Sequence, residues 1–378
     1  MSTPRYALLA LLPLASACGN VRYPVQQDGQ PGDTTGSEAI DRRMPGVEAS
    51  TASYPVDLLF MVDNSNSMEP KQQALTAAFP RLIEGLRHAK FGGKLPDLRI
   101  GVVSSDPGVG TSYTVPSCTA GGDGGKLQNK ARLGACPVPR DPWISYSAGV
   151  TNIADGPVDP VERVKVAFSC IATLGTGGCG FEQPLESLRR ALDPKLKVNP
   201  GFLRDEALLV IFLITDEDDC SVSDPTLLDP SATATYGDLN SYRCTRFGVA
   251  CNESLSTVGA KTGCKPAGDK LHTTADYISF FSGLKPAGKV ILAALAGPTS
   301  FVKVGQDGTS LLLEPSCQSS NGSAAPAVRV EAVVTGVGSG SFFNAGIDAS
   351  EAPVSLNVCT LDLEPALRFL AKKIVATF

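Results

Sequence analysis

The feature that most limits how this chain folds is a set of long, nearly uninterrupted apolar runs. Residues 207–214 read ALLVIFLI, residues 56–62 read VDLLFMV, and residues 289–296 read KVILAALA. Runs of this length and composition predict strands that are buried on both faces of a sheet. Further strands are predicted at residues 98–104, 143–146 and 328–334.

Segments with apolar residues at helical spacing separate these runs. Leu75, Phe79, Leu82 and Leu86, for example, recur on one face of a helix. Other helices are predicted at residues 159–174, 182–192, 274–284 and 363–378. Strands that alternate with helices indicate an α/β, Rossmann-like fold, with a mostly parallel central sheet and helices on both faces. Ligands of such sheets bind at the carboxyl ends of the strands.

The first residues predict a targeting segment. Residues 1–17 have the pattern of a signal peptide, with Arg5 before a short apolar stretch. Ala15-Ser16-Ala17-Cys18 resembles a bacterial lipobox, although Ala stands where Leu is usual, three positions before the cysteine. The alternative is an ordinary Ala-x-Ala cleavage site. We expect a lipidated Cys18, a flexible tether over residues 18–53, and an exported lipoprotein anchored to a bacterial outer membrane, on either its periplasmic or its surface side.

The cysteines predict structural disulfides. The chain has 11 cysteines, so 10 remain when Cys18 is set aside (11 − 1). An even set in an exported protein indicates disulfides, and a zinc site is disfavoured because the chain has two histidines and no C-x-x-C pair. Short loops favour the pairs Cys118–Cys136 and Cys170–Cys179. The remaining cysteines allow 15 pairings, in which Cys359 can fasten the entry to the last helix: Cys220, Cys244, Cys251, Cys264, Cys317 and Cys359.

Charge and hydropathy narrow the classes of partner. The net charge is −5, and the sequence has no stripe of basic residues. Nucleic acid is therefore not the expected partner. No apolar run approaches the roughly 18 residues that a membrane span requires. We therefore expect attachment to a membrane through the lipid anchor alone.

A short polar motif follows the first predicted strand. Asp63-Asn64-Ser65-Asn66-Ser67 has the form D-x-S-x-S, and the most apolar strand ends at Thr215-Asp216. In these two landmarks the chain resembles the von Willebrand factor type A (VWA) family, which includes integrin I domains, over residues 54–378. Long insertions interrupt the resemblance at about 105–141, 221–286 and 299–327. The alternative is that Asp63 and Ser65 only cap the helix that follows.

The resemblance implies a metal-ion-dependent adhesion site (MIDAS). Ser65 and Ser67 would bind Mg²⁺ or Mn²⁺ directly, and Asp63 and Asp216 directly or through water. Oxygen ligands suit such hard cations. A water position would stay open for an acidic group of a partner.

One ligand of the family is missing from this chain. Cys179 stands where the family has a threonine, so that Glu182 or Thr176 would take its place. A third carboxylate would make the site net negative and weaken its attraction for an acidic partner. The acids Glu217, Asp218 and Asp219 form either a second, Ca²⁺-binding site or a solvated acidic loop.

These observations predict a cell-envelope protein that binds an extracellular or envelope protein or glycan through its cation. One alternative is a structural cation with the disulfide-rich insertions as the binding surface. Another is a metal-assisted hydrolase. We expect no enzyme, because the sequence has no G-x-S-x-G or H-E-x-x-H motif and offers no evident general base.

The lipidation hypothesis is tested by intact mass spectrometry of the mature protein purified from a bacterial host. We expect a chain that begins at Cys18, carries acyl groups and has no free thiol. A chain that begins at an unmodified Cys18 would instead support the Ala-x-Ala cleavage site.

Overall fold

The computed structural model describes residues 54–378, except residue 133, residue 339 and residues 346–355. The predicted signal peptide, Cys18 and the tether lie outside the described residues. No described helix is both long and apolar enough to cross a membrane.

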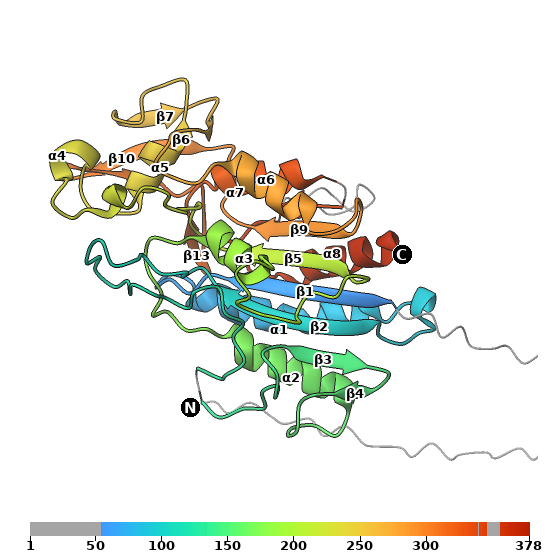
Figure 1. Cartoon of the computed structure of the whole chain (residues 1–378). Coiled ribbons are helices and arrows are strands. Elements are labelled where there is room, and N and C mark those ends of the chain that lie inside the picture. The colour runs from blue at the N-terminus through green and yellow to red at the C-terminus, as the bar shows by residue number, and fades with distance from the viewer. Residues whose placement is uncertain (1–53, 133, 339, 346–355) are drawn as a thin grey trace, which may run out of the picture. The chain divides into compact units, whose positions relative to one another are not determined.

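A seven-stranded sheet forms the centre of the fold, in the order β14-β9-β5-β1-β2-β3-β4 (Figure 1). Neighbours from β14 to β2 are parallel, whereas β3 and β4 add an antiparallel edge. The predicted mostly parallel α/β fold is therefore confirmed. The strands are β1 (Pro55–Val62), β2 (Asp97–Ser104), β3 (Ile144–Ser147), β4 (Val150–Thr151), β5 (Leu208–Ile214), β9 (Val290–Leu295) and β14 (Phe342–Phe343).

The register of the sheet brings the carboxyl ends of its central strands to one level. Val62, the last residue of β1, pairs with Ser104 of β2 and with Ile214 of β5. The residues that follow these three strands therefore meet along the boundary formed by the carboxyl ends of the strands, which is called the carboxyl edge of the sheet. This is the edge at which parallel α/β sheets hold their ligands.

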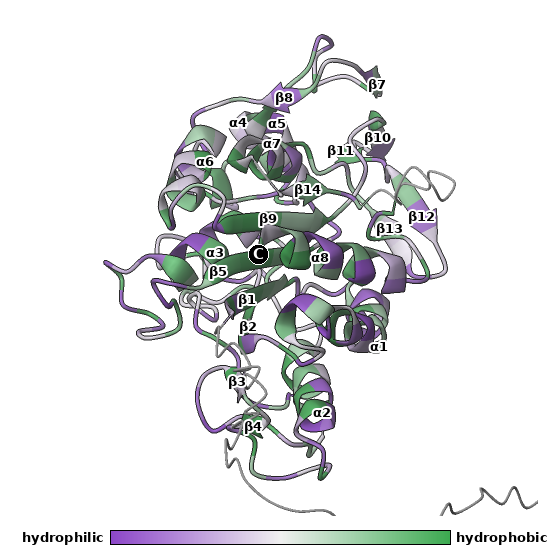
Figure 2. Ribbon diagram, turned by 90° about the vertical axis from the view of Figure 1, so that its right-hand side faces the viewer, coloured by the Kyte–Doolittle hydropathy of each residue, from purple (hydrophilic) through white to green (hydrophobic). Residues whose placement is uncertain are grey.

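Helices cover both faces of the sheet. Side chains alternate along β1, so that Leu58 and Phe60 enter one apolar core while Leu59 and Met61 enter the other. The hydropathy colouring in Figure 2 shows the central strands as the most apolar layer. The first core contains α1 (Glu69–Leu86), α2 (Pro160–Ala172) and α8 (Glu364–Thr377), and the second contains α3 (Pro184–Leu192), α6 (Thr274–Gly283) and α7 (Val328–Val337).

The insertions have secondary structure of their own. The segment between β5 and β9 contains a 3₁₀ helix (Pro225–Leu228), α4 (Thr233–Tyr236), α5 (Tyr242–Gly248), β6 (Val249–Ala250), β7 (Gly259–Lys261) and β8 (Lys265–Pro266), followed by α6. After β9 come β10 (Val302–Asp307), β11 (Ser310–Leu313), β12 (Cys317–Ser319) and β13 (Gly322–Ala324). A second 3₁₀ helix, Ala89–Phe91, follows α1.

The strand predicted at residues 328–334 is wrong, because this segment lies in helix α7. Its valines are compatible with either structure by composition alone. Val330, Val333 and Val334 have helical spacing and are fully buried against the sheet. The side chain of Asp218 also accepts hydrogen bonds from the backbone N–H groups of Arg329 and Val330 in the first turn, which stabilises a helix start.

Five disulfides join the 10 cysteines of the described residues, and both predicted pairs are wrong. Cys118 pairs with Cys179 and Cys136 with Cys170, in place of Cys118–Cys136 and Cys170–Cys179. The entropy of loop closure grows only slowly with loop length, so the packing of the loop after β2 against α2 decides the partners. The others are Cys220–Cys244, Cys251–Cys264 and Cys317–Cys359. Five disulfides indicate an oxidising compartment outside the cytoplasm.

Candidate metal centre

Asp63 joins three strand ends at this edge of the sheet. Its backbone N–H donates to the carbonyl oxygen of Ile214 at 3.0 Å, which extends the pairing of β1 with β5. Its buried carboxylate accepts hydrogen bonds from Ser105 Oγ, after β2, at 2.9 Å and from Thr215 Oγ1, after β5, at 2.7 Å. The backbone N–H of Ser65 donates to the same carboxylate at 2.8 Å.

The helix-capping alternative does not match this geometry. Helix α1 begins at Glu69, its N-cap residue is Met68, and no side chain caps it. Asp63 lies five residues before Met68, and its carboxylate instead closes a turn by accepting from the backbone N–H of Ser65. The turn directs Ser65 and Ser67 to the same place, with their Oγ atoms 3.4 Å apart. Two oxygens at this distance can both contact one cation, because Mg²⁺ binds oxygen at about 2.1 Å.

A buried lysine that the sequence analysis missed lies at the second landmark. Lys71 Nζ donates to Asp216 Oδ2 at 2.8 Å and to the carbonyl oxygen of Ser67 at 3.2 Å. Lys71 and Asp216 are 0% and 2% exposed. The other oxygen of this carboxylate, Asp216 Oδ1, is buried and has no hydrogen-bond partner among the described residues.

Gln72 is a second residue that was missed. Its Nε2 donates to the carbonyl oxygens of Asp63 at 2.8 Å and Gly175 at 3.0 Å, and its Oε1 accepts from Gly175 N at 3.1 Å. Lys71 and Gln72 lie in the first turn of α1, directly after the D-x-S-x-S turn. Their place at the start of the helix that follows the motif was the available signal.

The loop between α2 and α3 closes against the D-x-S-x-S turn. Gly178 N donates to the carbonyl oxygen of Asn64 at 2.8 Å, and a Cβ atom on Gly178 would lie 2.3 Å from Asn64 Oδ1. Only glycine permits this approach. The disulfide Cys118–Cys179 holds the next residue, so Cys179 is not a free ligand.

The two predicted substitutes for the missing threonine lie in different surroundings. Thr176 is half-buried in this loop, and none of the described hydrogen bonds joins its hydroxyl to the site. Glu182, by contrast, is 3% exposed and lies within electrostatic range of Asp63, Glu217 and Asp216. The structure therefore brings Glu182, rather than Thr176, into the group of acids.

The acids of the site repel one another. Burial, and then the charge of Asp216, raises the pKa of Asp63 to about 6. Burial and the same neighbour raise the pKa of Glu217 to about 8. Burial, and then the charge of Asp63, raises the pKa of Glu182 well above its usual range. These shifts show that ionised carboxylates are costly here unless a cation offsets them.

The side chains that could bind a cation here offer only oxygen atoms, from serine hydroxyls and from aspartate carboxylates. The described residues contain no cluster of three or more His, Cys, Asp or Glu side chains in position to hold a metal ion. A cation here would therefore depend on the hydroxyls of Ser65 and Ser67 together with Asp63 and Asp216. The unpartnered oxygen of Asp216 and the closely spaced hydroxyls fit a small, hard cation.

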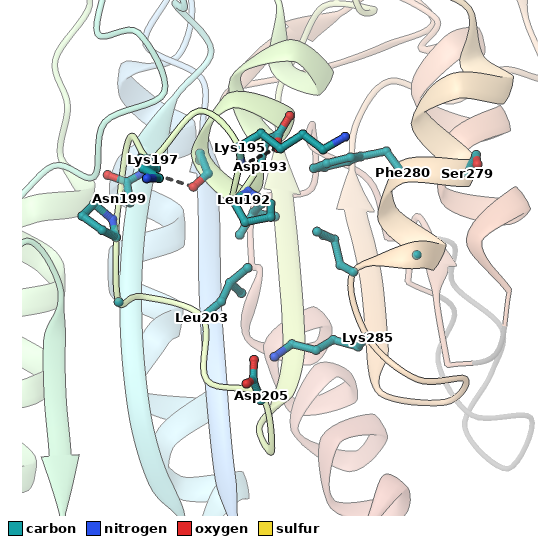
Figure 3. A pocket seen from close by; sticks show the side chains of 16 residues that line it. Leu192, Asp193, Lys195, Lys197, Asn199, Leu203, Asp205, Ser279, Phe280 and Lys285 are labelled. Atoms are coloured by element: carbon teal, nitrogen blue, oxygen red, sulfur yellow. Dashed lines mark hydrogen bonds between the residues drawn. The ribbon is translucent and has the colours of Figure 1, made fainter.

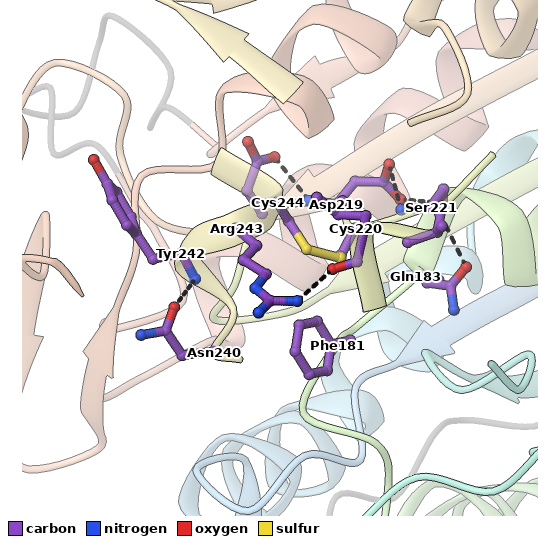
Figure 4. Close-up of a disulfide and its surroundings, with 12 residues drawn as sticks. Phe181, Gln183, Asp219, Cys220, Ser221, Asn240, Tyr242, Arg243 and Cys244 are labelled. Carbon is purple, nitrogen blue, oxygen red and sulfur yellow. Dashed lines mark hydrogen bonds between the residues drawn. A yellow bond between two sulfur atoms is a disulfide. The ribbon is translucent and has the colours of Figure 1, made fainter. Parts of the chain in front are cut away.

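Two of the acids that follow Asp216, Asp218 and Asp219, have structural roles. Asp218 accepts from the backbone of α7, and Asp219 Oδ1 accepts from Leu185 N at the start of α3 at 3.1 Å. Asp219 Oδ2 also pairs with the buried guanidinium of Arg329 at 3.2 Å. Both aspartates are buried, so the solvated-loop alternative is wrong for them, whereas Glu217 is partly exposed. Figure 4 shows Asp219 beside the Cys220–Cys244 disulfide, which attaches this loop to α5.

A separate cavity of about 800 Å³ lies at the other ends of the strands, away from the carboxyl edge of the sheet (Figure 3). Its lining includes Leu192 at the end of α3, Leu203 ahead of β5, and Phe280 on α6. These positions are near the amino ends of β5 and β9. None of the residues that line it belongs to the candidate metal centre.

Comparisons with known proteins leave the family open. No family model matches the chain, and no curated protein matches it. Among solved structures, the chain is similar to the pilus adhesin RrgA from Streptococcus pneumoniae, with 16% identity and a TM-score of 0.22. The match covers 44% of this chain and 21% of the adhesin. A likeness of this size carries no argument about fold or function.

The role of Thr215 as a donor to Asp63 is tested by Thr215→Val, which keeps the shape of the side chain and removes its hydroxyl. One oxygen of a buried carboxylate then loses its donor, so the free energy of unfolding should fall by about 1–3 kcal/mol. Urea denaturation measures the change. The matched control is Thr335→Val on the exposed face of α7, where a change within about 0.5 kcal/mol is expected. Equal effects of the two substitutions would refute the role of Thr215.

Proposed function

We propose that residues 54–378 form a VWA-like domain that binds a partner through a divalent cation. In this proposal Mg²⁺ or Mn²⁺ is held by Ser65 and Ser67 directly, and by Asp63 and Asp216 directly or through water. The cation would supply a Lewis-acid position for an oxygen atom of the partner. The chain's own residues would hold that position rigidly at the edge of the sheet.

The observation that carries the proposal is the unpartnered Oδ1 of Asp216. A buried carboxylate oxygen without a donor is unfavourable by itself, because its desolvation is not offset. It lies in a group of four acids: Asp63, Glu182, Asp216 and Glu217. Among the described residues, the one ion pair that any of these four acids forms is that of Asp216 with Lys71. A divalent cation would offset both the missing hydrogen bond and the excess negative charge.

The position of Ser67 supports a binding role over a purely structural one. Ser67 is exposed, whereas Ser65 is 4% exposed and Asp63 fully buried. A cation held by Ser67 would therefore have one side toward solvent, where a partner can reach it. We infer an acidic group of a protein or glycan in the cell envelope as the first candidate ligand. Ionisation of Glu182 or Glu217 would weaken that attraction.

The proposed location is the surface of a bacterial outer membrane or its periplasmic side. The five disulfides support export from the cytoplasm. Attachment through a lipid on Cys18 remains part of the proposal and rests on the sequence pattern alone.

The proposed cation site is tested by Ser67→Ala and thermal unfolding with and without Mn²⁺. The wild type should gain thermal stability with Mn²⁺, because a ligand that binds only the native state stabilises it. Ser67→Ala should lose most of that gain, because it removes a ligand from an exposed side chain with little effect on the fold. This variant is preferred to Asp63→Ala, since Asp63 also joins three strand ends.

The matched control is Asn66→Ala in the same turn. Asn66 is exposed and lies between the two serines, but it is not among the proposed ligands. Its Mn²⁺-induced shift should equal that of the wild type. An unchanged shift in Ser67→Ala, or no shift in the wild type, would contradict the proposed site.

A further inference from the structure

Lys71 is unusual because its charge is completely buried. Its side chain is 0% exposed, and the amino group has two acceptors, Asp216 Oδ2 and the carbonyl oxygen of Ser67. A buried ammonium is retained only where an opposite charge and hydrogen bonds offset its desolvation. Lys71 and Asp216 therefore depend on each other, although 145 residues separate them in the chain.

The β12–β13 hairpin encloses the amino group. A Cβ atom on Gly322 would lie 2.8 Å from Lys71 Nζ, and the φ angle of Gly322 is +100°. This backbone conformation favours glycine, and a larger residue would also displace the Lys71 amino group.

The hairpin is itself fastened to the segment that leads into α8. The disulfide Cys317–Cys359 joins the two, Ser319 Oγ donates to the carbonyl oxygen of Cys359 at 2.6 Å, and Asn321 Nδ2 donates to that of Thr360 at 2.9 Å. The fully buried Lys71 side chain therefore lies against a hairpin that a disulfide and two hydrogen bonds hold in place.

We propose that Lys71 is a permanent internal cation of the metal centre, which keeps the site folded without metal and limits its affinity for a divalent cation. The inference rests on the proposed function and adds a residue outside the ligand set. Lys71 binds one oxygen of Asp216 and leaves the other, Oδ1, without a donor among the described residues and so available to a cation. It acts through Asp216 and is therefore a positioning residue.

The charges determine whether Lys71 raises or lowers the affinity of the site for a divalent cation. Two positive charges a few ångströms apart in a buried site repel each other, so the ammonium opposes binding of a divalent cation. The same ammonium offsets the charge of Asp216 when no metal is bound. Without it, the apo protein would contain an uncompensated buried carboxylate, which is strongly destabilising.

The test compares Lys71→Gln with Lys71→Arg in the intact, disulfide-bonded protein. Gln removes the charge but retains a hydrogen-bond donor for Asp216, whereas Arg retains the charge. Calorimetric titration with Mn²⁺ measures affinity, and thermal unfolding in EDTA or in excess Mn²⁺ measures how far the fold depends on the metal.

We expect Lys71→Gln to bind Mn²⁺ at least tenfold more tightly than the wild type. In EDTA it should unfold at a lower temperature, and Mn²⁺ should raise that temperature by more than it does in the wild type. Lys71→Arg should retain an affinity close to that of the wild type. If Lys71→Gln folds only in the presence of Mn²⁺, the inference is supported in its strongest form.

The outcomes separate this inference from the proposed function. Mn²⁺ binding by the wild type, together with equal or weaker binding by Lys71→Gln, would overturn the role of Lys71 alone. A Lys71→Gln variant that does not fold even with Mn²⁺ would also overturn it. Absence of Mn²⁺ binding by both proteins would overturn the role of Lys71 and the proposed function together.

Discussion

The buried carboxylate of Asp63 is the interaction on which the arrangement of the site depends. It accepts hydrogen bonds from Ser105 and Thr215, at the ends of the two strands that flank β1, and it also closes the turn that presents the serines. These donors can reach one carboxylate only because the parallel register ends β1, β2 and β5 at the same level. The geometry of the site is thus a consequence of sheet pairing, which is itself fixed by the apolar runs.

The loops around this edge are held by covalent and ionic contacts that are distant in sequence. The Cys118–Cys179 disulfide fixes the loop that presses on Asn64, and Cys317–Cys359 fixes the hairpin over Lys71. Asp218 and Asp219 cap α7 and α3, which attaches the loop after β5 to the second face of the sheet. A site with several mutually repelling acids is stable only if its surroundings are rigid, and these contacts supply that rigidity.

The sequence predicted those parts of the fold that depend on local patterns. The apolar runs predicted the central strands β1, β5 and β9, and helical spacing predicted α1, whereas the short strands β4 and β14 were not predicted. The D-x-S-x-S motif predicted the place of Asp63, Ser65 and Ser67 after the first strand. The rest depends on contacts across the fold. The valines of α7 fit a strand or a helix until the cap from Asp218 is known, the disulfide partners follow from loop packing, and the ion pair of Lys71 with Asp216 spans 145 residues.

In the proposed metal centre, a divalent cation binds between the serine hydroxyls and Asp216. The most direct measurement is an anomalous difference map from crystals of the oxidised protein grown with Mn²⁺. We expect one strong peak at about 2.1 Å from the Oγ atoms of Ser65 and Ser67, on the side of Asp216 Oδ1, with the Lys71 ammonium still bound to Oδ2. A map with no peak at this edge of the sheet, or with its strongest peak at other residues, would contradict the proposed cation site.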